Sequence, residues 1–375
     1  MTKQSLKYFF SEIGSIPVIL QSSHYPSLNG LRGIAIIMVV LSHLGLSENP
    51  LYKAVANGHL GVLIFFVISG FLIITLCIKE KVVTKGVSLK KFYIRRILRI
   101  FPVAYLYLVA IITINLIYKL DIHYINLLGA GLYLMDFSSY FRKHYFSWYT
   151  GHYWSLAVEE QFYLIVPFIL KNQFVVYLSL ILFIIFALPV IISLQYFYPP
   201  LNTGLIYAFT HFMIKFQAIA VGCLFSVIIF KYPGIKNTLS QSKLIGNIIA
   251  IFLILFIHYD DLFTLDNMYA GMLISFLTGY IIVSNISQSK DLVYKLLNSR
   301  ILEIIGVLSY SIYIWQQLFT SKDTRLPGFM VVFPYNIICI IAVSCLSYYC
   351  YESFFLKLKS KYTKIKTDAR ILAPL

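Results

Sequence analysis

Charged side chains inside apolar segments are the residues of this chain best suited to chemistry, because a charge within a membrane is costly and seldom lacks a function. Arg32 and His43 stand eleven residues apart in one such segment. Eleven residues make about three helical turns, so the two side chains share one face, about 16 Å apart along the axis. This spacing predicts a histidine that acts as a base or acyl carrier and an arginine that binds an anion. The structural alternative is an interfacial histidine and an arginine that follows the positive-inside rule.

A second group of basic residues comes directly before an apolar segment and contains Arg95, Arg96 and Arg99. Arg95 and Arg99 are four residues apart and therefore share a helix face. Two guanidinium groups in this arrangement can hold a phosphate in a bidentate manner. The alternative is a juxtamembrane basic helix that contacts anionic lipid headgroups.

A third group stands at the beginning of another apolar segment and contains His152, Ser155, Glu159 and Glu160. His152 and Glu159 are about two helical turns apart and share a face. Two adjacent carboxylates among apolar residues need a partner, because their burial is otherwise too costly. This group predicts an acid–base function, with a structural network between helices as the alternative.

The remaining polar residues of interest accompany many aromatic residues, a pattern typical of packing and of membrane-interface belts. Tyr310 and Tyr313 lie in one such segment, and Glu352 follows another and is expected to pair with a basic group. The chain contains no HExxH, GxGxxG or GxxxxGK[ST] pattern. It therefore predicts no metal site and no soluble-type nucleotide-binding fold.

The composition identifies the elements that must position these residues. Of the 375 residues, 59% are hydrophobic and 12% are charged, whereas soluble domains average about 45–50% and about 25%. This excludes a soluble enzyme, a disordered chain and a fibrous protein, and it predicts an all-α polytopic membrane protein. The net charge of +16 is explained by basic loops on the cytoplasmic side of the membrane, and these loops indicate the orientation of the chain. No nucleic-acid partner is therefore expected.

Ten apolar segments are long enough to predict transmembrane helices. They cover residues 30–46, 60–78, 101–118, 153–170, 174–195, 214–230, 244–258, 268–285, 303–320 and 330–350. The apolar stretch 124–137 is too short to cross, so residues 119–151 are expected to form an outer-side or re-entrant excursion. Basic loops at 79–99, 231–243 and 286–300 then lie in the cytoplasm together with both chain termini. An acidic loop that holds Asp260, Asp261 and Asp266 lies outside.

We predict a single membrane domain over residues 1–375, with an N-terminal tail 1–25, a basic C-terminal tail 357–375 and no added soluble domain. Residues 1–29 lack a clean apolar core that ends in a small-residue cleavage site. The first apolar segment is therefore expected to be a retained anchor.

Taken in order, these groups resemble the acyltransferase-3 family of membrane O-acyltransferases. The resemblance rests on Leu28–Gly33 with His43, Gly61–Ile73, Arg95–Pro102, His152–Tyr163, Leu308–Tyr313, and Tyr349 with Glu352. It implies a membrane domain of about ten helices that moves an acyl group, usually acetyl, from cytoplasmic acyl-coenzyme A to a sugar hydroxyl of an extracytoplasmic or lipid-linked glycan. It further implies the cytoplasmic membrane of a bacterium, with the lipid bilayer and the glycan as partners and no metal.

The resemblance also suggests roles for individual residues. The expected donor-site residues are basic, small or aromatic: Arg32, Arg95, Arg96, Arg99, Phe65, Phe66, Ser69 and Gly70. The expected catalytic residues are His43, Glu159, Glu160 and His152. His43 is either a general base or an acylated carrier, and one of the two glutamates orients its imidazole. Substrate contact or support is expected from Trp154, Ser155, Tyr310, Tyr313 and Glu352, with the Trp154 indole as a donor to the thioester oxyanion.

Two positions depart from the family pattern. Relatives often carry Arg-x-Asp before the glycine that corresponds to Gly222, whereas this chain has Lys215 and Gln217. Many relatives have histidine after the tryptophan, whereas this chain has Gln316. A multi-pass transporter or glycan flippase is the alternative function, and a donor other than acetyl-coenzyme A is a third possibility. The sequence leaves open the acceptor, the choice between direct transfer and an acyl-enzyme, and the oligomeric state.

Overall fold

The computed structural model describes residues 3–22, 24–137, 147–198, 204–234, 243–259 and 266–362, and within these ranges it contains helices and no strand. The N-terminal half holds α1 (Lys3–Phe10), η1 (Val18–Leu20), α2 (Pro26–Leu44), α3 (Pro50–Val55), α4 (Gly58–Thr84), α5 (Leu89–Tyr118), α6 (Tyr124–Gly131), η2 (Met135–Phe137), α8 (Trp148–Gly151) and α9 (Tyr153–Asn172). The C-terminal half holds α10 (Phe174–Leu182), η3 (Phe183–Ala187), α11 (Leu188–Phe197), α12 (Gly204–Met213), η5 (Ile214–Phe216), α13 (Gln217–Lys231), α15 (Lys243–Tyr259), α16 (Asp266–Asn285), α17 (Leu292–Leu297), α18 (Arg300–Phe319), α19 (Gly328–Val331), α20 (Tyr335–Leu346), η6 (Ser347–Glu352) and α21 (Ser353–Lys361).

The predicted all-α membrane architecture is confirmed. Among the described residues, eight helical stretches are long and apolar enough to cross a membrane. They are Pro26–Leu44, Pro50–Thr84, Leu89–Tyr118, Phe174–Phe197, Gly204–Lys231, Met268–Asn285, Arg300–Phe319 and Tyr335–Lys361. The other two predicted spans form α9, which carries the adjacent Glu159 and Glu160, and α15, which is shorter. The count of ten and the cytoplasmic termini therefore stay predictions.

The short apolar stretch 124–137 forms α6, a helix of eight residues, and the single turn η2. Eight helical residues extend only about 12 Å, far less than the hydrocarbon core of about 30 Å. This agrees with the expectation that the stretch does not cross. Residues 138–146 of the same excursion, Asp260 and Asp261 of the acidic loop, and the tail beyond residue 362 lie outside the described residues.

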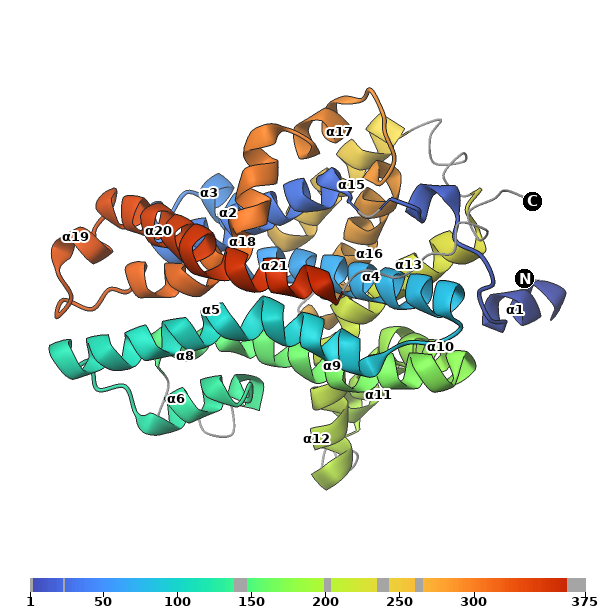
Figure 1. Cartoon of the computed structure of the whole chain (residues 1–375), viewed down its shortest axis with the longest axis horizontal. Coiled ribbons are helices and arrows are strands. Elements are labelled where there is room, and N and C mark those ends of the chain that lie inside the picture. Colours follow the sequence, from blue (N-terminus) through green and yellow to red (C-terminus); the bar gives the residue numbers. More distant parts are fainter. Residues whose placement is uncertain are drawn as a thin grey trace.

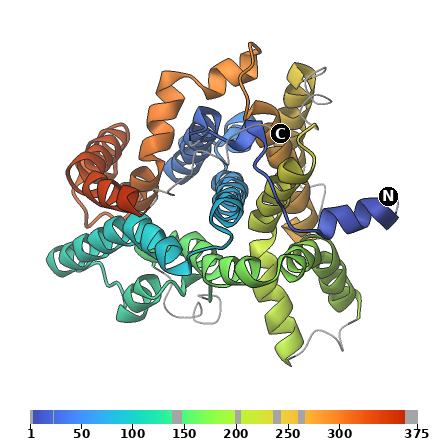
Figure 2. The ribbon, with the colours of Figure 1, turned by 45° about the vertical axis from the view of Figure 1, so that its right-hand side comes forward.

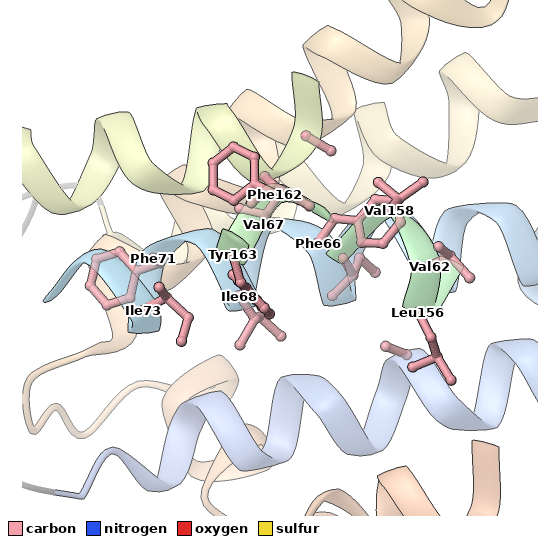
Figure 3. Close-up of a cluster of buried hydrophobic side chains, with 14 of the residues drawn as sticks. Val62, Phe66, Val67, Ile68, Phe71, Ile73, Leu156, Val158, Phe162 and Tyr163 are labelled. Carbon is pink, nitrogen blue, oxygen red and sulfur yellow. The ribbon is translucent and has the colours of Figure 1, made fainter. Parts of the chain in front are cut away.

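Helix α4 lies in the middle of the bundle, where Figure 2 shows it nearly end-on among α2, α5, α9 and α13. Its sequence is apolar on all faces, as expected of a helix surrounded by other helices. Asn57 caps its N-terminus by accepting a hydrogen bond from the backbone of Leu60. Phe66 and Phe71 of α4 pack with Phe162 and Tyr163 of α9 in one buried cluster (Figure 3). The central helix thus holds the helices that carry the polar groups.

Glycines allow α4 to approach α13 closely. A Cβ atom added at Gly70 would lie 2.0 Å from the backbone oxygen of Ile219, and one added at Gly222 would lie 2.1 Å from that of Val67. Small residues at such crossings permit tight contact between membrane helices. Gly70 is therefore occupied in helix packing, which corrects the expectation that it lines the donor path.

Helices α2 and α18 meet in the same way. A Cβ atom added at Gly306 would lie 1.8 Å from the backbone oxygen of Asn29. The two helices run beside each other in Figure 1 and make extensive contacts. This crossing fixes the position of His43, near the end of α2, relative to the last turns of α18.

Candidate active site

A buried cavity of about 100 Å³ brings together side chains from α2, α4, α5, α9 and α18. We call it the basic cavity. Ten of the predicted site residues line it: Arg32, Phe65, Phe66, Ser69, Arg96, Arg99, Ser155, Glu159, Tyr310 and Tyr313. Residues that are up to 281 positions apart in the chain, from Arg32 to Tyr313, thus form one site.

The three arginines of α5 have different surroundings. Arg95 donates from Nη2 to Glu80 over 2.9 Å and does not line the basic cavity. Arg99 lines the cavity and donates from Nη1 to Glu352 over 2.6 Å. Arg96 also lines it, with its guanidinium 5.0 Å from the centre of the Tyr163 ring. The sequence predicted Arg95 and Arg99 as the pair, whereas the structure turns Arg96 and Arg99 to the cavity.

Glu352 forms an ion pair with a basic residue of α5. Its carboxylate is 1% exposed, binds Arg99, and accepts a second hydrogen bond of 2.6 Å from the hydroxyl of Ser311. Because both carboxylate oxygens are engaged, the burial of this charge is compensated. The residue thereby holds Arg99 against the end of η6 and the side of α18.

The two adjacent glutamates lie away from the candidate catalytic histidine. Glu159 lines the basic cavity with Arg32 and Arg96 and accepts a hydrogen bond of 3.4 Å from the hydroxyl of Tyr163. Neither Glu159 nor Glu160 lines the chambers that contain His43. The prediction that one of these glutamates orients the His43 imidazole is therefore wrong, because Glu159 faces the arginines of the basic cavity.

His43 is positioned by the end of its own helix. Helix α2 stops at Gly45, which has a left-handed φ of 56°, the conformation that glycine favours at a helix C-terminus. This leaves the imidazole in the last turn, with its Nδ1 atom 2.8 Å from Oε1 of Gln316 on α18. The Gln316 amide donates from Nε2 to Gln317 over 3.0 Å, which leaves Oε1 as the acceptor for His43. Nδ1 then carries the proton, and Nε2 has the free lone pair.

Three chambers meet at His43. The connecting chamber, of about 430 Å³, is also lined by His152, Trp154, Val62 and Tyr313. Val62 and Tyr313 line the basic cavity as well, so the two spaces share walls. The large chamber, of about 940 Å³, and the small chamber, of about 420 Å³, both include His43.

His152 is a buried residue in the wall of the connecting chamber. Its ring packs edge-on against Tyr107 and Tyr313, and neither ring nitrogen completes a hydrogen bond within the described part of the chain. The Tyr313 hydroxyl donates to the backbone oxygen of His152 over 3.0 Å and lies 2.5 Å from Ser155 Oγ. Ser155 and Tyr313 thus support the wall between the two spaces.

Sequence inspection missed two parts of the site. The sequence singled out Gln316 only as a departure from the family pattern. Its contact partner, His43, is 273 positions away in the chain. Lys215, the other departure, forms an ion pair of 3.0 Å with Asp136, whose side chain is 1% exposed. Gln161 donates to the same carboxylate over 2.9 Å. The acidic group that the local motif lacks is therefore supplied by η2, more than seventy positions away.

The described residues contain no group of three or more His, Cys, Asp or Glu side chains that could hold a metal ion. The side chains that line the site offer an imidazole, guanidinium groups and a carboxylate. Fold and site together define a multi-helix membrane protein with an arginine-lined cavity and a histidine-lined chamber next to each other in one bundle.

The chain belongs to the acyltransferase-3 family, because the model of that family's Acyltransferase domain matches residues 25–352. It is 30% identical over 314 residues to the "Putative O-acetyltransferase" proteins of Staphylococcus aureus strains COL and MSSA476, covering 78% of this chain and 50% of theirs. It is also 30% identical over 312 residues to O-acetyltransferase OatA of Staphylococcus aureus strain NCTC 8325, with the same coverage. The chain thus spans about half the length of these relatives. No solved structure matches it.

Proposed function

We propose that this protein transfers an acyl group, in the first place acetyl, from acyl-coenzyme A to a sugar hydroxyl. One observation carries the proposal: the basic cavity and the connecting chamber of His43 share Val62 and Tyr313 as walls. A donor held at the arginines therefore lies next to the chamber that contains the imidazole, with Val62 and Tyr313 in the wall between the two spaces. Family membership supports acyl transfer as the reaction class, and the alternative of a transporter or flippase has no such support.

The donor site is assigned to the basic cavity. Its volume of about 100 Å³ is below the 300–1,000 Å³ or so of sites that enclose a whole drug-sized ligand. It suits a narrow pantetheine arm, with the phosphates and the nucleotide at its entrance. Arg96 and Arg99 bind the phosphates through charge-assisted hydrogen bonds. Arg32 stands beside Glu159 and binds the arm or holds the cavity wall.

His43 acts as a general base through Nε2. Nδ1–H donates a hydrogen bond to Oε1 of Gln316, so the imidazole is held in the tautomer whose Nε2 accepts a proton. Donor and acceptor reach this one ring from different chambers, so direct transfer needs no acylated intermediate. This orienting role belongs to Gln316 and replaces the role that the sequence gave to Glu159 or Glu160.

The reaction then balances as follows. Nε2 takes the proton of the sugar hydroxyl while the hydroxyl oxygen attacks the thioester carbonyl carbon. A donor near the carbonyl stabilises the negative oxygen, and the Trp154 indole on the chamber wall is our candidate. The carbon–sulfur bond breaks, and the leaving sulfur takes the proton back from the imidazolium. The products are the sugar ester and the free coenzyme A thiol.

We place the arginine end at the cytoplasmic face of a bacterial cytoplasmic membrane and the His43 end at the outer face. The basic loop 79–99 adjoins the basic cavity through α5, and basic loops favour the cytoplasm. Acyl-coenzyme A is then bound from inside, and a glycan from outside.

The test is binding and turnover of acetyl-coenzyme A by the purified protein in lipid vesicles. Wild type is compared with His43→Ala, Arg96→Ala and the control His24→Ala, which removes an exposed histidine paired with Glu303. We expect His43→Ala to bind the donor without turnover, Arg96→Ala to lose affinity, and His24→Ala to behave as wild type. Wild type without affinity for acetyl-, succinyl- or other short acyl-coenzyme A would disprove the donor site.

A further inference from the structure

Two side-chain amides connect His43 to a backbone carbonyl on another helix. Gln316 Oε1 lies 2.8 Å from Nδ1 of His43, and Gln316 Nε2 donates to Oε1 of Gln317 over 3.0 Å. Gln317 Nε2 in turn donates to the backbone oxygen of Trp148 over 2.8 Å. We call these three hydrogen bonds the amide relay. It runs from α2 through the last turn of α18 to the start of α8.

The direction of the amide relay is fixed at the Trp148 end. A backbone carbonyl can only accept a hydrogen bond, so the Gln317 atom beside it must be the amide nitrogen. The Gln317 oxygen then faces Gln316 and accepts from the Gln316 nitrogen. This turns the Gln316 oxygen to His43, where it accepts a hydrogen bond from Nδ1–H. The lone pair of the imidazole is thereby placed on Nε2.

Burial makes the reversed direction unfavourable. Gln316 is 0% exposed and Gln317 is 3% exposed, so bulk water does not compete for their amide groups. If the whole relay were reversed, the Gln317 oxygen would lie against the Trp148 oxygen, and neither of these two acceptors has a proton to share. Buried polar groups left without a partner are costly. One backbone carbonyl is therefore enough to select the tautomer of a histidine two side chains away.

Trp148 is held in place by a second hydrogen bond that runs the other way. Its indole Nε1 donates to the backbone oxygen of Gln317 over 2.8 Å. Trp148 and Gln317 thus form a reciprocal pair, in which each side chain donates to the other residue's backbone. The indole also contacts the imidazole of His43, with the two ring centres 5.3 Å apart and the planes at 77°, an arrangement that aromatic pairs favour.

We infer that Gln317 and Trp148 are positioning residues for His43: the Trp148 carbonyl sets the direction of the amide relay, and Gln317 passes it to Gln316. The inference rests on the proposed function and goes beyond it, because it identifies what orients Gln316 itself. Trp148 and Gln317 are 169 positions apart. The short helix α8 must therefore be docked on α18 for Nε2 of His43 to be free to act as a base.

The first test measures which nitrogen of His43 carries the proton. Nitrogen-15 spectra of the full-length protein with labelled histidine, at about pH 8, distinguish the two neutral tautomers, and the His43 signal is the one that His43→Ala lacks. We expect a protonated Nδ1 in wild type. Gln317→Met keeps the length of the side chain and removes both polar groups, so it should give a mixture of tautomers. Gln317→Glu keeps an acceptor for Gln316 and should retain the wild-type tautomer.

The second test measures turnover and donor affinity of the same variants. Gln317→Met should lower kcat about tenfold, the effect of roughly one lost hydrogen bond. Its KM for acetyl-coenzyme A should not change, because Gln317 does not line the basic cavity. Trp148→Phe keeps an aromatic ring without the Nε1 donor and should lower kcat several-fold. Gln195→Met changes an equally buried glutamine on α11, and it should keep the wild-type kcat and tautomer.

The possible failures can be told apart. The tautomer is measured without substrate, so it tests the amide relay even if wild type turns over no acyl-coenzyme A, which would refute the proposed function. A wild-type His43 with its proton on Nε2 would overturn the inference. A Gln317→Met protein with the wild-type kcat and tautomer, or with a changed KM alone, would overturn it as well. If Gln317→Met does not fold, an unchanged kcat and tautomer in Trp148→Phe has the same meaning.

Discussion

The Nδ1 atom of His43 lies 2.8 Å from Oε1 of Gln316, across a crossing where α2 and α18 approach closely. A neutral amide oxygen thus occupies the position where a carboxylate orients many catalytic histidines. An amide fixes the tautomer without adding a negative charge to a buried site, whose desolvation would need further compensation. The arginines and Glu159 line the basic cavity, which does not include His43.

Gln316→Ala is expected to lower kcat about tenfold or more, because one hydrogen bond that orients the imidazole is lost. Donor affinity is expected to stay unchanged. Gln316→Glu, which keeps an acceptor at the same place, should recover most of the rate, whereas a merely structural defect would not be rescued in this way. Gln195→Ala removes a glutamine that is also buried and lies on α11, and it should keep the wild-type rate. Equal rates for Gln316→Ala and wild type would contradict the assignment.

Arg96→Ala should weaken acetyl-coenzyme A binding about tenfold or more, because Arg96 lines the basic cavity and charge-assisted bonds to phosphate are strong. Arg95→Ala should leave donor affinity nearly unchanged and lower stability, because Arg95 is bound to the buried Glu80. Calorimetric titration and thermal unfolding of both variants measure the two effects. A larger loss of affinity for Arg95→Ala than for Arg96→Ala would favour the arginine pair that sequence spacing predicts.

Glu352→Ala should destabilise the protein by about 2–3 kcal/mol, somewhat below the cost of breaking a fully buried ion pair. The variant leaves Arg99 and Ser311 without their acceptor. The melting temperature in detergent should fall by several degrees. Glu303→Ala removes a glutamate from an exposed pair with His24, and it should change stability by less than about 1 kcal/mol. Equal effects of the two variants would rule out a structural role for the Arg99–Glu352 pair.

Gly70→Ala should lower the melting temperature or prevent folding, because the added Cβ would lie 2.0 Å from the backbone of α13. Overpacking of this kind costs about 1–3 kcal/mol or more. Gly271→Ala is the matched control, since its Cβ would meet only Leu63 at an ordinary 3.8 Å. Gly271→Ala should be neutral or slightly stabilising. A stable Gly70→Ala with weakened donor binding would restore the sequence prediction that Gly70 lines the donor path.

The loop that follows α18 lines both the large and the small chamber, and it is held by an ion pair whose pH dependence has a defined sign. Hydrogen bonds from Arg325 lower the pKa of Asp323 to about 2. Because this value is below the ordinary value of the group, the pair stabilises the fold at pH above about 4. That stabilisation is lost as the pH falls through about 2.

Melting temperatures of wild type and Arg325→Gln should therefore differ by a constant amount between pH 5 and 8, and the difference should shrink below pH 4. Thermal unfolding over this pH range measures it. A difference that grows as the pH falls would show that the pair does not stabilise the loop.

The sequence by itself determined the helical membrane architecture and the family, because apolar segments and ordered local motifs are properties of neighbouring residues. It also determined that Arg32 and His43 share a face, since both lie on one helix with a fixed period. Several of the residues that the sequence selected do gather in one cavity: Arg32, Arg96, Arg99, Glu159 and Tyr313.

The partners of these residues were decided only by the tertiary structure. Helical periodicity predicted Arg95 with Arg99 as the pair, whereas Glu80 on α4 holds Arg95 in an ion pair. The glutamates of α9 face the arginines instead of His43, and the crossing of α2 with α18 supplies Gln316. Contacts between distant segments depend on how helices cross and which backbones approach closely, and a periodicity along one helix carries no information about that geometry.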